Sequence, residues 1–217
     1  GTEKEKSWVG ESVLHTKPAK DIKFSDRVGD KQIDFVFTGR WPFRVREEKD
    51  GRLRIHDGQH EGWVNKADFV LASESFAYFD GRVQVNAKDG FALSMRGAFW
   101  LARKEPDKAI KDFDGCIMLN PKDSSAFNNR ALAWVAKKDY DKAIADYTEA
   151  VKINPKSPVA FDNRGNAWRY QREYDKAIKD YDEALRLEPR YTNALYDRGA
   201  AWSGKKEYDN AIKDFDE

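Results

Sequence analysis

Residues 124–157 read SSAFNNRALAWVAKKDYDKAIADYTEAVKINPKS, and residues 158–191 read PVAFDNRGNAWRYQREYDKAIKDYDEALRLEPRY. The two stretches align without a gap, and their step of 34 residues continues on both sides of them. The columns that repeat at this step are Trp100, Trp134, Trp168 and Trp202; Arg96, Arg130, Arg164 and Arg198; Ala109, Ala143, Ala177 and Ala211; Asp112, Asp146, Asp180 and Asp214; Pro121, Pro155 and Pro189; and Tyr140, Tyr174 and Tyr208. Because unrelated residue types share one register, the sequence predicts an array of repeated units.

Within each unit the apolar residues fall at helical spacing. In the unit 158–191, Phe161, Gly165 and Trp168 lie on one face of a first helix. A second stripe follows, formed by Ala177, Ile178, Tyr181, Ala184 and Leu185. Pro189 ends the unit because proline cannot continue a helix. A helical hairpin of this kind cannot bury its apolar stripe alone, so we expect the units to stack into a right-handed solenoid.

The unit resembles the tetratricopeptide repeat. It has a large apolar residue, Gly or Ala four positions on, an aromatic residue three further, and then Ala, an aromatic residue, Ala and a closing Pro. Four units fit this pattern, at 90–123, 124–157, 158–191 and 192–217, the last of them incomplete. Two departures stand out. The aromatic residue of the first helix is Trp where Tyr is commoner, and the seventh residue of each unit is Arg where Leu is usual.

The arginine column has a partner column. Antiparallel pairing within a hairpin places Arg164 beside Asp180, and the same geometry applies in the other three units. We therefore expect a structural ladder of ion pairs, rather than a row of arginines that binds an anion. The single cysteine, Cys116, stands where later units have Ala150 and Ala184, so we expect a packed small side chain rather than a reactive thiol.

The first 73 residues have a different pattern, in which β-branched and aromatic residues alternate with polar ones. Strands are predicted at 8–16, 32–38, 43–48, 52–55, 61–64 and 69–71, with a hairpin at Asp50-Gly51 and a long loop over 17–31. This number of short strands predicts a small closed or partly closed barrel.

The end of this region resembles the Src-homology-3-like (SH3-like) barrel, in particular its bacterial relatives. Gly62-Trp63-Val64, four linking residues and Phe69-Val70 match the last two strands of that family. The resemblance implies either binding of a polyproline or cell-wall peptide, or a role as a spacer. Asn65 replaces the Pro that usually follows the Trp-containing strand, which argues against polyproline binding.

The fold class expected is therefore α+β in two domains, a small all-β SH3-like barrel followed by an all-α superhelical solenoid. The domain boundaries predicted are 1–73 for the barrel, 74–89 for a capping half-repeat helix and linker, and 90–217 for the four repeats. The chain begins Gly1-Thr2-Glu3 without Met and stops inside an amphipathic pattern, so we expect a fragment of a longer protein.

Composition and motifs exclude several classes of function. Lys and Arg number 39 and Asp and Glu 38, and neither half of the chain is basic, which argues against nucleic-acid binding. We find no apolar run long enough to cross a membrane, no phosphate-binding glycine loop and no catalytic constellation. His56 and His60 lie in a Gly-containing stretch without the helical spacing of a metal site. No enzyme activity, cofactor or metal is predicted.

The candidate site is the inner surface of the solenoid, which tetratricopeptide arrays line with first-helix residues. The resemblance places ten residues in a peptide-binding groove: Asn128, Asn129, Asp162, Asn163, Asn166, Arg169, Tyr170, Asn193, Tyr196 and Asp197. Asn disfavours helix interiors, so several on one face suggest that hydrogen bonds to a bound backbone offset the cost. Chaperone-binding relatives grip a terminal carboxylate with Lys, Asn and Arg, whereas here Asp162 or Asp197 replaces the Arg, so that clamp is not expected.

We therefore expect a non-catalytic scaffold that docks a partner peptide in the concave groove. The alternative is a cell-wall module, in which the barrel binds peptidoglycan peptides and the repeats act as a spacer or in assembly. Both hypotheses place the protein in a bacterium, and the sequence leaves open whether it is cytoplasmic, periplasmic or exported.

Overall fold

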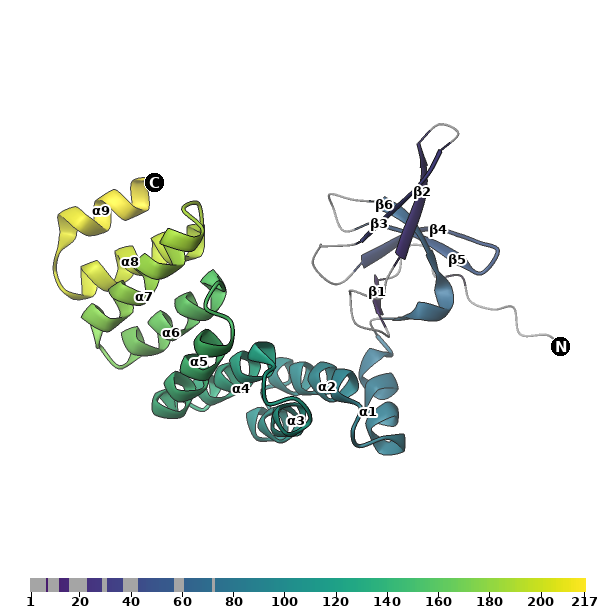
Figure 1. Ribbon diagram of the computed structural model, residues 1–217, viewed down its shortest axis with the longest axis horizontal. Coiled ribbons are helices and arrows are strands. Elements are labelled where there is room, and N and C mark those ends of the chain that lie inside the picture. The colour runs from purple at the N-terminus through teal and green to yellow at the C-terminus, as the bar shows by residue number, and fades with distance from the viewer. Residues whose placement is uncertain are drawn as a thin grey trace. The chain divides into compact units, whose positions relative to one another are not determined.

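The computed structural model describes residue 7 and residues 12–15, 23–28, 31–36, 43–56, 61–71 and 73–217. Its contacts divide the chain into two compact units, Gly1–Ala92 and Leu93–Glu217. The first unit contains an antiparallel sheet and a helix, and the second is entirely helical (Figure 1). The expected fold class, an α+β chain with a small β region before a helical solenoid, is confirmed; the residue boundaries of the domains stay predictions.

The sheet of the first unit has the strand order β3-β2-β6-β5-β4-β1-β7. Its strands are β1 (Ser12–His15), β2 (Lys23–Val28), β3 (Lys31–Val36), β4 (Phe43–Lys49), β5 (Arg52–His56), β6 (Glu61–Asn65) and β7 (Phe69–Leu71). Among the strand side chains that the structure describes, the buried apolar ones are Val13, Leu14, Val45, Leu53, Ile55, Val64, Phe69 and Val70. Leu53 and Ile55 lie two positions apart on β5, as expected for a strand that buries one face.

The predicted hairpin at Asp50-Gly51 is confirmed, and the turn that follows it is also described by the structure. β4 and β5 form a hairpin in which Asp50 and Gly51 both have positive φ, at 50° and 71°, the backbone of a type I′ turn. A 3-10 turn (η2, Lys66–Asp68) joins β6 to β7, and Asn65 caps it by accepting a hydrogen bond from the backbone of Ala67. The resemblance to an SH3-like barrel stays a prediction.

The predicted loop over 17–31 is wrong, because β2 occupies Lys23–Val28. β2 pairs along its whole length with β3, from Lys23↔Val36 to Val28↔Lys31, and it also pairs with β6 at Ser25↔Trp63. The sequence of β2 is too polar to show apolar alternation, so backbone pairing with its neighbours decides that it is a strand. The Gly29-Asp30 pair between the two strands is a hairpin signal in the sequence.

The helix α1 (Ser75–Val85) follows the sheet and buries Phe79 and Val83. Phe79 contacts Phe91 edge to face, with ring centroids 5.7 Å apart, and Arg82 pairs with Asp89. A helix was predicted here, and its role as a cap on the solenoid stays a prediction.

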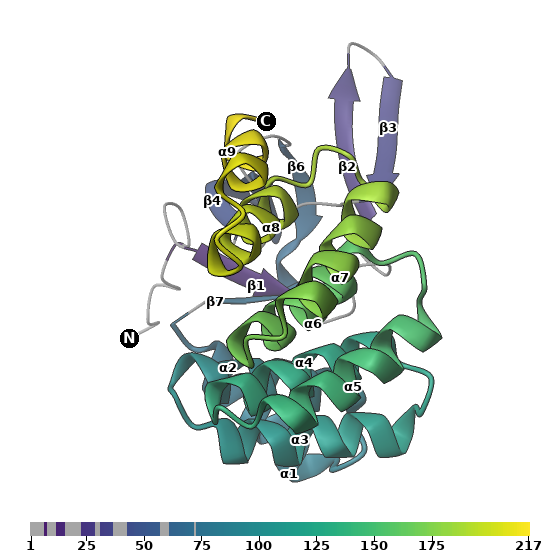
Figure 2. The same cartoon turned by 90° about the vertical axis from the view of Figure 1, so that its left-hand side faces the viewer.

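The helices that follow repeat at a step of 34 residues. The first helices of the hairpins are α2 (Gly90–Ala102), α4 (Ser124–Ala136), α6 (Pro158–Tyr170) and α8 (Thr192–Gly204), and the second helices are α3 (Pro106–Leu119), α5 (Tyr140–Ile153), α7 (Tyr174–Leu187) and α9 (Tyr208–Asp216). In Figure 2 the hairpins α4–α5, α6–α7 and α8–α9 follow one another, each turned relative to the last. The bounds of the helices match the predicted register.

Aromatic rings of second helices pack against small residues of first helices. The Tyr181 ring is fully buried, and a Cβ added at Gly165 would lie 2.7 Å from it. This close approach explains the small residue in each first helix. The apolar core also crosses between units, because Ala177, Ile178 and Tyr181 share a buried cluster with Ala194 of α8. Cys116 is buried, and burial raises the pKa of its thiol to about 12, in agreement with the predicted packing role.

The predicted ladder of ion pairs is confirmed. Arg164 donates from Nε and Nη2 to the two carboxylate oxygens of Asp180, at 2.8 and 2.7 Å. The same bidentate pair recurs in the other units as Arg96–Asp112, Arg130–Asp146 and Arg198–Asp214. These aspartates are buried, so the fold depends on the geometry of each pair.

Each of three arginines also reaches the second helix of the preceding unit. Arg130 donates from Nη1 to Asp114 at 2.6 Å, and Arg198 donates in the same way to Asp182 at 2.7 Å. At the equivalent place, Arg164 donates from Nη1 to the hydroxyl of Thr148, at 3.3 Å. One side chain therefore ties its own hairpin together and joins it to the hairpin before.

We expect the Arg164–Asp180 pair to show strong coupling in unfolding. Asp180→Leu leaves the guanidinium of Arg164 partly buried without its carboxylate, and Arg164→Leu leaves the carboxylate of Asp180 buried without its guanidinium. Each substitution should therefore lower the free energy of unfolding by about 3 kcal/mol. The double variant should lose much less free energy of unfolding than the sum of the losses of the two single variants. Urea unfolding of the four proteins measures this cycle, and simply additive losses would contradict it.

Candidate functional site

The predicted groove residues lie on the first helices of three consecutive units. α4 carries Asn128 and Asn129; α6 carries Asp162, Asn163, Asn166, Arg169 and Tyr170; and α8 carries Asn193, Tyr196 and Asp197. We call this surface the inner face. Asn128, Asp162 and Tyr196 occupy the same position of their units, one step of 34 residues apart.

Direct hydrogen bonds join neighbouring first helices across the inner face. Asn163 of α6 donates from Nδ2 to Oδ1 of Asn128 on α4, at 3.0 Å. Asn166 of α6 donates to Oδ2 of Asp197 on α8, at 2.8 Å. The structure therefore brings residues from all three helices together on one face.

Around Asn166 the bonds form a small network. Its Oδ1 accepts from Nη2 of Arg169 at 2.8 Å and from the hydroxyl of Tyr181 at 3.1 Å. Burial raises the pKa of Tyr181, so its hydroxyl stays protonated and can donate. Arg169 Nη2 also lies 3.3 Å from Oδ1 of Asp197.

These bonds correct one part of the sequence argument. The helix cost of the asparagines was expected to be offset by a bound backbone. Instead, Asn128 and Asn163 bond each other, and Asn166 bonds Arg169, Tyr181 and Asp197. Much of the cost is therefore offset within the fold, and a ligand is not needed to explain it.

Asp162 is buried differently from the aspartates of the ladder. Its side chain is 4% exposed, and its Oδ1 is enclosed without a hydrogen-bond partner. Burial, together with the nearby Asp197, raises the pKa of Asp162 to about 7, and Arg169 opposes the shift. The inner face thus holds a carboxyl group that is close to half-ionised at neutral pH.

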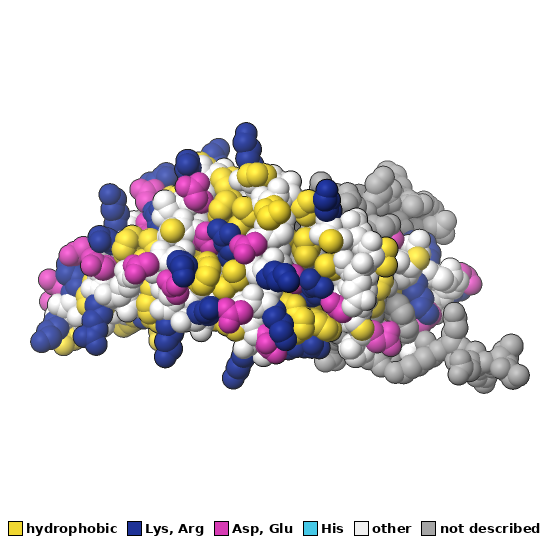
Figure 3. All heavy atoms as spheres, turned by 90° about the horizontal axis from the view of Figure 1, so that it is seen from below, with side chains coloured by type: hydrophobic (Ala, Val, Ile, Leu, Met, Phe, Trp, Pro, Cys, Tyr) yellow, Lys and Arg dark blue, Asp and Glu magenta, His cyan; other side chains and the backbone are white. Residues whose placement is uncertain are grey.

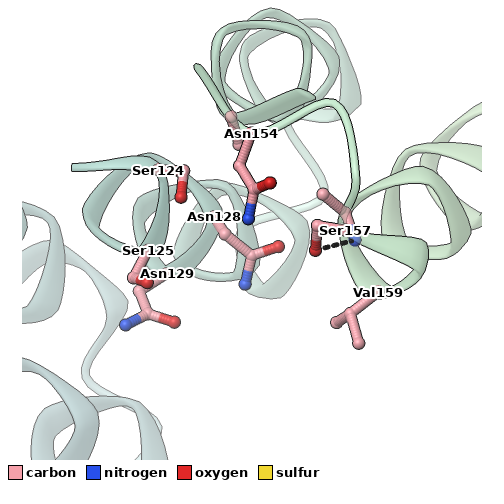
Figure 4. A pocket seen from close by; sticks show the side chains of 9 residues that line it. Ser124, Ser125, Asn128, Asn129, Asn154, Ser157 and Val159 are labelled. Atoms are coloured by element: carbon pink, nitrogen blue, oxygen red, sulfur yellow. Dashed lines mark hydrogen bonds between the residues drawn. The ribbon is translucent and has the colours of Figure 1, made fainter. Parts of the chain in front are cut away.

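A polar pocket of about 350 Å³ opens beside the inner face. Its lining comes from α4, from the end of α5 and from the start of α6: Ser124, Ser125, Asn128, Asn129, Ala150, Asn154, Ser157, Val159 and Ala160. In Figure 4 the side chain of Asn154 points toward Asn128, and Ser157 lies across the pocket from them, at the N-cap of α6. Amide and hydroxyl groups in this arrangement can both donate and accept hydrogen bonds.

Sequence reasoning missed Ser124, Asn154 and Ser157. The resemblance carries over only positions inside the first helices, whereas Asn154 and Ser157 lie in the connection from α5 to α6. A signal was present, because Asn154 repeats Asn120 at the step of 34 residues.

Two tyrosines of the inner face remain accessible. Tyr170 is 49% exposed and stacks on Tyr140 of α5, with ring centroids 5.2 Å apart. Tyr196 is 66% exposed and lies 5.6 Å from the ring of Phe215 on α9. Exposed tyrosines held by a neighbouring ring offer contact area at low entropic cost.

The charges seen in Figure 3 are mixed, with basic and acidic side chains interspersed over that face. Within the described part of the chain, no group of three or more His, Cys, Asp or Glu side chains could hold a metal ion. The structure describes only the backbone of His56, and His60 lies outside the described residues. No helix among the described residues has the length and apolar character required to span a bilayer.

Residues 124–157 and 163–191 match the tetratricopeptide repeat family. MamA from Desulfovibrio magneticus RS-1, solved from residue 41 to its end, has a similar fold, with a TM-score of 0.60 and 20% identity over 66% of this chain and 81% of that chain. The first TPR domain of human RPAP3 has a TM-score of 0.53 and 25% identity, over 56% of this chain and 95% of its own. The first TPR domain of Spaghetti (RPAP3), bound to the HSP90 peptide SRMEEVD, has a TM-score of 0.53 and 24% identity, over 56% of this chain and 96% of that chain. No curated protein matches the chain.

We expect Asp162→Asn to stabilise the protein in a pH-dependent way. The folded pKa of about 7 lies above the ordinary value of 3.8, so the wild-type fold retains a proton that the unfolded chain has lost. Stability from this group is therefore complete at low pH and falls as the pH rises from about 4 to about 7. The amide does not ionise, so the variant should match wild type near pH 4 and exceed it by about 1 to 3 kcal/mol above pH 7.

Urea unfolding from pH 4 to pH 8 measures this difference. Asp209→Asn is the matched control, because Asp209 is exposed in the first turn of α9. The control should follow the wild-type pH profile. A constant difference between Asp162→Asn and wild type across this range would contradict the prediction.

Proposed function

We propose that this chain, which carries tetratricopeptide repeats, is a protein–protein interaction scaffold that docks a peptide segment of a partner on the inner face of α4, α6 and α8. The observations that support this most directly are the Ser- and Asn-lined pocket at Asn128 and Asn129 and the exposed rings of Tyr170 on α6 and Tyr196 on α8. Such groups can bond a peptide backbone and pack against its side chains.

Rigidity of the inner face supports the same proposal. The cross-helix bonds Asn163–Asn128 and Asn166–Asp197 hold the three first helices in register, and the ladder of ion pairs holds each hairpin behind them. A surface organised in advance loses little conformational entropy when it binds, so the ordering cost falls mainly on the peptide.

The similar fold of Spaghetti (RPAP3) was solved with the HSP90 peptide SRMEEVD. We propose a peptide-docking role for this chain as well, but with a different kind of ligand. Asp162 and Asp197 lie on the inner face of this chain, and acidic side chains there disfavour an acidic peptide or a terminal carboxylate.

The test is an affinity pull-down from a lysate of the source organism, compared between wild type and the double variant Asn163→Ala/Tyr196→Ala. The variant removes one cross-helix amide bond and one exposed ring from the inner face. The matched control is Asn210→Ala/Tyr208→Ala on α9, where both side chains are exposed. We expect partners that the wild type and the control retain and that the inner-face variant loses, and cross-linking to α6 or α8 should locate the contact.

Equal retention by all three proteins would contradict docking on the inner face. It would also favour the alternative hypothesis, in which the N-terminal β region binds a cell-wall peptide. Co-sedimentation with peptidoglycan by the full chain, unaffected by the inner-face variant, would identify that alternative as cell-wall binding.

A further inference from the structure

Asp162 is a buried acid that the fold does not use. The buried aspartates of the ladder each accept two hydrogen bonds from an arginine. Oδ1 of Asp162 accepts none, although Arg169 lies close enough to act on its charge. Arg169 instead donates to Asn166 and Asp197, and its own Nε is enclosed without a partner.

The repeat itself shows that this position does not require an acid. The equivalent residues one unit before and one unit after are Asn128 and Tyr196. A buried carboxylate without a hydrogen-bond donor destabilises a fold, and a second acid nearby, Asp197, adds repulsion. Asp162 therefore destabilises the fold, and no hydrogen bond to its Oδ1 compensates for this effect.

The residues equivalent to Asp162 in the neighbouring units lie at accessible places of the inner face. Asn128, its equivalent on α4, lines the polar pocket, and Tyr196, its equivalent on α8, is exposed. Asn163, the next residue along α6, makes the cross-helix bond to Asn128. The charge of Asp162 is coupled to Asp197 of α8 and to Tyr191, which precedes α8, so its carboxyl group lies on the side of α6 that faces α8.

We propose that Asp162 is the acceptor for a basic side chain, lysine or arginine, of the peptide that docks on the inner face. This inference rests on the proposed function and specifies its ligand. A cationic group supplies the N–H donor that Oδ1 lacks, and its charge offsets the repulsion between Asp162 and Asp197. The long aliphatic stem of lysine or arginine lets the charged group extend from a bound peptide toward a buried carboxylate.

Acidic and phosphorylated peptides fit this place poorly. Either would bring a further negative charge to a surface where Asp162 and Asp197 already lie close together. Arg169 offsets this negative charge only in part, because its Nη2 is already engaged with Asn166 and Asp197. The chemistry of the site thus selects for a positive charge and against a negative one.

Selection from a phage-displayed library of random twelve-residue peptides tests the proposal with the full chain. We expect wild type and the control Asp209→Asn to enrich peptides that share a lysine or arginine at one aligned position, and Asp162→Asn to lose that preference. Asp162→Asn is expected to be at least as stable as wild type, so unfolding cannot account for the loss; circular dichroism and urea unfolding verify this.

A thermodynamic cycle then assigns the contact. The best peptide and its Lys→Gln or Arg→Gln version are titrated by calorimetry into wild type and Asp162→Asn. The peptide substitution should weaken binding about tenfold or more in wild type and much less in the variant, because the two changes remove the same charge pair.

Each other outcome is informative. Enriched peptides without a basic residue, or an equal effect of the peptide substitution in both proteins, would overturn the role of Asp162 and leave the proposed function intact. If wild type enriches no peptide at all, the proposed docking function fails, and this inference fails with it. Enrichment of acidic peptides would reverse the assigned charge preference.

Discussion

The arginine at the seventh position of each unit is the constraint on which the helical unit depends. Its guanidinium is held by two hydrogen bonds to the aspartate of its own second helix, as in Arg164 and Asp180. In Arg130 and Arg198 a third bond reaches an aspartate of the preceding second helix. Because a partly buried ion pair is stable only when its geometry is good, this one contact sets both the pairing within a hairpin and the register between hairpins.

The contacts that recur from unit to unit, the ladder and the small residues, lie between the helices, whereas the cross-helix bonds of the inner face differ from one pair of units to the next. Tyr181 packs against Gly165, and the core of one unit continues into the next through Ala194. The inner face is therefore free to vary from unit to unit, as Asn128, Asp162 and Tyr196 do at one equivalent position. A surface that varies on a constant frame is what a repeat protein uses to recognise a particular partner.

The contrast between Asp162 and Asp180 shows how environment decides the role of a residue. Both are buried carboxylates, on neighbouring helices of one hairpin. Asp180 has its arginine and supports the fold, whereas an oxygen of Asp162 has no donor and lies near a second acid. This difference is the reason why we propose a ligand contact for Asp162 and a purely structural role for Asp180.

In the N-terminal β region, the sequence predicted the elements that have strong local signals and missed β2, which has none. The Asp50-Gly51 hairpin and the turn between β6 and β7 follow from the residues of those segments. β2 does not, because its polar sequence becomes a strand only through pairing with β3 and β6. A strand is completed by its neighbours, so local sequence specifies it less well than it specifies a helix.

By itself, the sequence determined the step of 34 residues, the helical hairpin of each unit and the pairing of Arg with Asp, because these follow from local periodicity and from the antiparallel geometry of a hairpin. Only the tertiary structure decided which inner-face groups find partners. The amides of Asn128 and Asn163 bond each other, Asn154 lines the pocket beside Asn128 from a connecting segment, and Asp162 is left with an oxygen that has no partner. Those outcomes depend on distances between helices of different units, and no spacing along the chain encodes such distances.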